Sequence, residues 1–315
     1  CMTHQTTASL GQVFPLELKM SDSRSYGAGV VCVFVAALSW STAGLFTRVV
    51  ETDIPTTLLW RSALGGLSVL LIYIVMKRAQ NLGELVRFKF GEFIVATLSA
   101  LGMMCFISAF FYTSIANVSF VYGAMPLVTM LMAWVVLRDP VTSVGIIATI
   151  LSGLGVGVLV WGGQHFGDFL GLGLAFLMTF FMGAVTVAAK FFPDADAMKS
   201  AYLSGFIAAL LVFPFSQSGS ASSHDLVWLA LYGLVNVGLG FGVYLFGVSR
   251  ISAVAAALIG LSEVPLAPIW AFALFDEQIS FHMIAGGCLI VTASVIYILA
   301  SNTNSVEEQT EASKA

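Results

Sequence analysis

The sequence predicts an all-helical integral membrane protein whose ten transmembrane helices form two inverted repeats of five. Three observations predict this class: a scarcity of charge, ten apolar runs of spanning length, and an internal repeat. Hydrophobic residues make up 58% of the chain and charged residues 10%, against about 25% charged in typical soluble domains. Transmembrane β-strands would alternate polar and apolar residues, which continuous runs such as VVCVFVAAL do not.

The apolar runs give the order of the spans. An α-helix needs about 20 apolar residues to cross the hydrocarbon core of a bilayer. Runs of this length predict spans at residues 27–49, 57–76, 93–112, 118–137, 142–162, 170–191, 199–215, 226–247, 253–275 and 281–300. Short links leave little room for extramembrane domains, and we expect tails at 1–26 and 301–315. The first 19 residues are polar and nondescript, so we expect Met20 to be the natural start and 1–19 not to be native.

The basic residues predict the orientation. With the N-terminus in the cytoplasm, Arg48 is the one basic residue on the outer side, and Arg61 lies within the second span. This bias follows the positive-inside rule and places both termini in the cytoplasm of a bacterium, with the chain in its inner membrane. The inner side collects the other eleven of the thirteen Lys and Arg residues: Lys19, Arg24, Lys77, Arg78, Arg87, Lys89, Arg138, Lys190, Lys199, Arg250 and Lys314.

Two stretches of the chain repeat each other. Residues 125–142, MPLVTMLMAWVVLRDPVT, align with residues 263–280, EVPLAPIWAFALFDEQIS, each a proline-bearing helix that ends in an acidic turn. The halves are therefore predicted at 27–162 and 170–300. Because five is an odd number of spans, the second half enters the membrane from the opposite face. A shift of 138 pairs Ala133 with Ala271, Asp139 with Glu277 and Thr142 with Ser280, and a shift of 142 pairs Gly29 with Gly171, Phe34 with Phe176 and Arg48 with Lys190.

These residues carry a family resemblance. SEVPLAPIWAFALFDEQIS, the following IAGGCLIVTASVIYIL and the matching MPLVTMLMAWVVLRDPVT resemble the drug/metabolite transporter superfamily, specifically its ten-helix EamA-type permeases. The resemblance covers residues 27–300. It implies movement of small metabolites, often export of amino acids, by alternating access between two helical bundles. Because the motif is diffuse and apolar, it is informative about the fold and uninformative about the substrate.

Glu263 is the most informative candidate site residue. It follows the predicted start of the ninth span by ten residues, which places it about 15 Å deep, near the middle of the bilayer. A charge there costs roughly 2.5–3.5 kcal/mol and usually faces a cavity or a partner. The functional interpretation is a ligand for a substrate amine or a proton-coupling group. The structural alternative is a clamp on backbone freed where Pro265 and Pro268 break the helix, as Pro126 does in the first repeat. Met125 occupies the equivalent position there, which favours function over a clamp.

The other charges near the spans have simpler interpretations. Arg61 is predicted to lie about 6 Å below the outer interface, so we expect its side chain to snorkel outward. The alternative is a gate or a carboxylate-binding group near Glu263. Arg48 and Lys190 stand at helix ends on opposite faces and are expected to anchor there.

Weaker candidates are polar or aromatic residues within the spans. Asn236 lies about 15 Å into the eighth span, where its amide must find partners, and packing is as good an explanation as substrate contact. Trp40 stands away from the aromatic belt, which favours cavity lining, whereas Tyr112, Tyr122 and Tyr244 are more typical of the belt. The glycine pairs 153/157 and 238/242 predict close helix packing and leave both a monomer and a homodimer open.

Several functions lack their motifs. No Gly-x-x-x-x-Gly-Lys-Ser/Thr loop is present, so we expect no ATP-driven transport. His165, His224 and His282 fall in loops or at a helix start, which disfavours an intramembrane serine protease. No basic tract indicates nucleic acid. Three of the four cysteines, Cys32, Cys105 and Cys288, fall within spans as packing residues, and their spacing with Cys1 fits no metal site.

Together these observations predict a secondary transporter without cofactor, metal or catalytic residues. We expect it to move a small organic metabolite, an amino acid or a related compound, across the lipid bilayer of the inner membrane. Export is the favoured direction, and a proton or other ion is the expected coupling partner. The alternative is an intramembrane enzyme or a lipid flippase. Neither the substrate nor the ion follows from the sequence.

Overall fold

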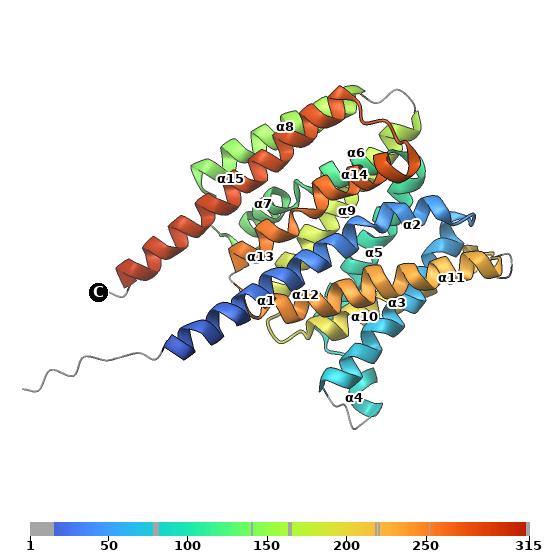
Figure 1. Ribbon diagram of the computed structural model, residues 1–315, viewed down its shortest axis with the longest axis horizontal. Coiled ribbons are helices and arrows are strands. Elements are labelled where there is room, and N and C mark those ends of the chain that lie inside the picture. Colours follow the sequence, from blue (N-terminus) through green and yellow to red (C-terminus); the bar gives the residue numbers. More distant parts are fainter. Residues whose placement is uncertain are drawn as a thin grey trace, which may run out of the picture.

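The computed structural model is a helical bundle (Figure 1). It describes residues 16–77, 82–139, 141–162, 166–217, 219, 221–251 and 253–312, and every regular element within these ranges is a helix. Arg78, His165 and the outermost parts of both predicted tails lie outside them. The described parts of the tails continue the first and last spans as helix, back to Leu16 and on to Ala312.

The predicted spans each correspond to helical structure. The first half contains α1 (Leu16–Ser41), α2 (Ala43–Val49), α3 (Ile54–Lys77), α4 (Leu82–Val86), α5 (Phe90–Tyr112), α6 (Ile115–Tyr122), α7 (Met125–Leu137) and α8 (Ser143–Gly162). The second contains α9 (Phe166–Phe191), α10 (Ala197–Val212), η1 (Phe213–Phe215), α11 (Ser223–Leu231), η2 (Tyr232–Leu239), α12 (Gly240–Val248), α13 (Ala253–Gly260), α14 (Glu263–Phe275) and α15 (Phe281–Ala312).

Nine helical stretches of the described chain are long and apolar enough to cross a membrane, and the bent pair α6 and α7 makes a tenth. The two helices of this pair meet at an angle of 40°. The prediction of an all-helical membrane protein with ten spans is therefore confirmed.

Prolines mark two of the helix breaks. Pro126 lies in the first turn of α7 and Pro265 in the first turn of α14, where a missing N–H costs little because that group has no partner within the helix. Pro268 is different, because α14 continues across it to Phe275. The prediction that Pro268 breaks the ninth span is therefore wrong. A further break, which the sequence did not indicate, separates α1 from α2 at Thr42.

The two repeats end their broken spans in the same way. Arg138 and Asp276 follow α7 and α14, and both adopt left-handed backbone, with φ of 59° and 52°. Their backbone N–H groups donate to the carbonyls of Ala133 and Ala271, respectively. These residues are related by the same shift of 138 that aligns the sequences, so the repeat extends to the backbone geometry of the helix ends.

Helices of one half pack on helices of the other. The helix α3 lies against α10, α5 against α9 and α8 against α15, the last pair side by side in Figure 1. A Cβ atom on Gly155 of α8 would lie 2.7 Å from the Gly286 carbonyl oxygen of α15, so this crossing requires glycine. Of the predicted glycine pairs, Gly238 and Gly242 do face α3, but Gly153 and Gly157 face away from the protein. The prediction that Gly153 and Gly157 pack within the bundle is therefore wrong, because the glycine of α8 that packs is Gly155, on another face of the helix.

Candidate functional site

A cavity of about 280 Å³ lies between the repeats. Its walls come from α1, α5 and α6 of the first half and from α9, α10, η2, α12 and α14 of the second. Most lining side chains are apolar or aromatic, with a few hydroxyl groups, one amide and one carboxylate. The lining residues include Trp40, Phe106, Tyr122, Asn236, Phe241 and Glu263.

Glu263 is the first residue of α14, and its side chain faces this cavity. Its carboxyl group is within hydrogen-bonding reach of the Tyr122 hydroxyl from α6. Two of the backbone N–H groups at the break before α14 are bonded without it. The N–H of Ser262 donates to the Ile259 carbonyl at 3.0 Å, and the N–H of Val264 donates to Leu261 at 3.1 Å. This arrangement favours a role in the cavity over a clamp on freed backbone.

Trp40 forms the opposite part of the wall, in the last turn of α1. Its ring packs against Tyr244, with centroids 5.2 Å apart and planes tilted by 49°. A Cβ on Gly240 would lie 2.5 Å from the indole nitrogen, so glycine at 240 is what lets the ring lie flat against α12. Tyr244 itself stands behind Trp40 and supports it, rather than lining the cavity.

Asn236 joins the cavity to a buried polar chain. It lies in η2, a π-helical segment of the eighth span, a feature that recurs at functional sites. Its amide nitrogen donates to the carbonyls of Ser39 and Trp40, at 3.1 and 3.3 Å, next to the break in the first span. Its oxygen accepts from Arg61 Nη2 at 3.0 Å. Asn236 therefore holds α1, α3 and the eighth span together while presenting one edge to the cavity.

Arg61 does not reach the surface. Its side chain is 2% exposed, with its guanidinium carbon 5.0 Å from the centre of the Tyr232 ring. The expectation that it snorkels to the outer interface is wrong, because the inner face of α3 at this level is covered by α10 and the eighth span. It is not a lining residue either, since Asn236 stands between it and the cavity.

The tyrosines divide in a way that the sequence did not predict. Tyr112 is 41% exposed at the end of α5 and does not line the cavity, which fits a belt position. Tyr122 lines the cavity beside Glu263, and Tyr244 packs behind Trp40, so the belt expectation is wrong for both.

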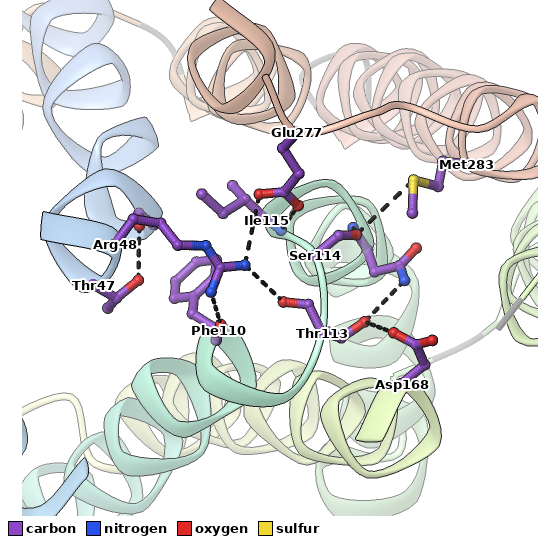
Figure 2. Close-up of polar contacts among 11 residues, drawn as sticks. Thr47, Arg48, Phe110, Thr113, Ser114, Ile115, Asp168, Glu277 and Met283 are labelled. Atoms are coloured by element: carbon purple, nitrogen blue, oxygen red, sulfur yellow. Dashed lines mark hydrogen bonds and ion pairs between the residues drawn. The ribbon is translucent and has the colours of Figure 1, made fainter. Parts of the chain in front are cut away.

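A second polar cluster lies where α2, α5 and α14 end, and we call this end of the bundle the Arg48 face (Figure 2). Arg48 donates to the carbonyls of Phe110 and Thr113, at 2.7 and 3.2 Å, and lies 3.6 Å from Glu277. Glu277 also accepts from the N–H of Ile115 at 2.7 Å. Arg48 therefore links the end of α2 to the end of α5 in its own repeat and to the connection after α14 in the other repeat.

The same cluster continues toward α9. The Thr113 hydroxyl donates to Asp168 at 3.0 Å and accepts from the Asn117 amide at 3.0 Å. Figure 2 shows that the contacts of Arg48 and those of Asp168 meet at Thr113, in the connection between α5 and α6. One loop of the first repeat is thus held from both sides at the Arg48 face.

The repeat-equivalent ion pair lies at the opposite end of the bundle, the Lys190 face. Lys190 lies 3.4 Å from Asp139, and their side chains are 65% and 48% exposed, against 31% and 19% for Arg48 and Glu277. The repeat shifts relate Arg48 to Lys190 and Glu277 to Asp139. Equivalent charges thus pair at both ends, half-buried at one end and more exposed at the other.

Sequence reasoning missed the cavity residues that carry no polar signal. Met178 and Met182 of α9 and Phe106 of α5 line it but are indistinguishable in sequence from lipid-facing residues. Ser119 and Ser204 also line it, and a small hydroxyl within a span is too common to single out. The Arg48–Glu277 pair could have been found, because the repeat alignment relates Arg48 to Lys190 and Glu277 to Asp139.

Two five-span halves around a cavity near the middle of the bundle define a multi-pass membrane permease built from repeats. The model of the EamA-like transporter family matches residues 27–161 and 169–299, once in each half. The chain belongs to this family of transporters, and the resemblance seen in the sequence is confirmed.

Comparison with solved structures agrees about the fold. One structure, described only as the crystal structure of a protein, superposes with a TM-score of 0.61 at 17% identity, covering 88% of this chain and 98% of that one. At this identity the likeness shows the fold alone. No curated protein matches the sequence.

Proposed function

We propose that this protein is a secondary active transporter that moves a small organic metabolite, an amino acid or a related compound, across the bacterial inner membrane in the direction of export. Both termini and the Lys190 face lie in the cytoplasm in this proposal, because the basic residues gather there. The observation that carries it is the cavity between the repeats with Glu263 in its wall. A carboxylate at this depth is expensive unless it has a partner or a function.

Alternating access would use the two ion pairs. The Arg48 pair is partly buried and hydrogen-bonded to the backbone, whereas the Lys190 pair is exposed and loosely held. This difference supports a state closed at the Arg48 face, with α5, α6 and α14 held together there. In the opposite state, repeat symmetry would tighten the Lys190 pair and release the Arg48 pair.

The test is transport by purified protein in proteoliposomes, with a panel of labelled metabolites and an imposed proton gradient. Glu263→Gln keeps the size and much of the hydrogen-bonding capacity of the side chain but carries no charge and exchanges no proton. We expect it to fold normally and to lose most transport per folded molecule. Near-normal flux in this variant would remove Glu263 from the mechanism. An absence of flux for every metabolite in the wild type, with lipid scrambling instead, would favour the flippase alternative.

A further inference from the structure

The charge of the cavity narrows the class of substrate. Among the described lining residues, Glu263 carries the only charged side chain, and the remaining polar groups are neutral hydroxyls and the Asn236 amide. A free amino acid would bring a carboxylate as well as an amine. An unpaired charge in a site of low dielectric constant is strongly unfavourable, because the lost hydration is not replaced.

The nearest cation is not available to a substrate. Arg61 is 2% exposed and is bonded to Asn236, whose amide nitrogen is in turn used by carbonyls of α1. For Arg61 to reach a substrate carboxylate, Asn236 would have to leave both sets of partners. The Arg61 guanidinium is thus a buried structural charge that does not line the cavity.

The positive ends of broken helices are the other usual site for an anionic group in transporters. Here the N-terminus of α14 carries Glu263 at its first position, so a carboxylate of the protein already occupies it. The equivalent helix α7 begins with Met125 and Pro126, and neither lines the cavity. A substrate carboxylate would meet repulsion at one break and no lining group at the other.

The remaining walls suit an organic cation. Trp40, Phe106, Tyr122 and Phe241 present aromatic rings to the cavity, and such rings attract ammonium groups through their negative faces. A volume of about 280 Å³ lies near the lower end of small-molecule pockets, which are about 300–1,000 Å³, so the cavity suits a small ligand.

We propose that the cavity selects a small monovalent amine with an apolar or aromatic body and no free carboxylate, which pairs with Glu263 while the rings surround its body. Among the substrates named in the proposed function, this excludes free amino acids and retains related amines. This inference rests on the proposed transport function but concerns binding alone. A protein that binds such an amine without moving it would refute transport and leave the inference intact.

Four related probes test the class on purified wild-type protein by calorimetry: phenethylamine, phenylalanine amide, phenylalanine and 3-phenylpropionate. The amide controls for size, because a neutral carboxamide replaces the free carboxylate of phenylalanine. We expect both amines to bind on the order of 100-fold more tightly than phenylalanine, and no binding of the propionate. Phenylalanine that binds as well as its amide, or a panel without any binding, would overturn the inference.

The role of Glu263 in this selection is tested by substitution. Glu263→Gln should abolish the preference of the site for the amide over phenylalanine, whereas Asp53→Asn, at an exposed position before α3, should leave it unchanged. A Gln variant that keeps the full preference would overturn the assignment. The wild-type comparison stands on its own if the variant does not fold.

Discussion

The two equivalent ion pairs should differ in what they contribute to stability, and this difference can be measured with a matched pair of variants. Glu277→Ala removes the acceptor of the Ile115 N–H at 2.7 Å and the counter-charge of Arg48 at 3.6 Å. A hydrogen bond to a charged group contributes about 1.5–3 kcal/mol. Asp139→Ala removes a pair in which Lys190 is 65% exposed, and exposed pairs contribute about 0.2–1 kcal/mol.

We therefore expect Glu277→Ala to lower the free energy of unfolding by about 1–2 kcal/mol more than Asp139→Ala does. The assay is reversible unfolding in mixed detergent micelles at neutral pH, followed by tryptophan fluorescence. Glu277→Gln separates the two contributions, because its amide oxygen still accepts from Ile115 while the charge is gone. Equal losses in the two Ala variants would show that burial at the Arg48 face does not strengthen the pair.

Three further predictions concern packing, the buried polar chain and orientation. Gly205→Ala should destabilise the crossing of α10 and α3, because its Cβ would lie 2.7 Å from the Ser62 carbonyl oxygen. Gly153→Ala, with open space around it, should be neutral or up to about 1 kcal/mol stabilising. Equal melting temperatures of the two variants would refute the claim about the crossing at Gly205. Asn236→Ala removes the amide oxygen that accepts from the buried Arg61 guanidinium and should cost about 3 kcal/mol, while Asn236→Asp should fold, and the reverse order would contradict the network. Reporter fusions after Gly219 and at Ala315 should report opposite compartments, and a shared compartment would exclude the ten-span topology.

The parts of the fold that were predictable from the sequence are those that depend on length and repetition. Span positions follow from the thickness of the bilayer, and the shift of 138 correctly related the ends of α7 and α14 at Arg138 and Asp276.

Rotation about the helix axis was not predictable. In a soluble helix, a polar face tells which side meets water, but both sides of a span here are apolar. Arg61 was therefore expected to point outward when it is buried inside the bundle, and Gly153 was expected to pack when Gly155 does so. Contacts between distant segments, such as Arg61 with Asn236, depend on the tertiary arrangement that this rotation decides.

The single carboxylate of the cavity has a consequence for energetics. If Glu263 is neutralised in turn by a proton and by a monovalent amine, the loaded site carries zero net charge in both directions. Exchange would then be electroneutral, and the membrane potential, worth about 2.3 kcal/mol per charge at 100 mV, would do no work on it. Each pH unit across the membrane would support about a tenfold amine gradient, or about 1.4 kcal/mol. Flux that stays constant while a potassium diffusion potential is varied with valinomycin would agree with one-for-one exchange, and voltage-dependent flux would require a second charge in the cycle.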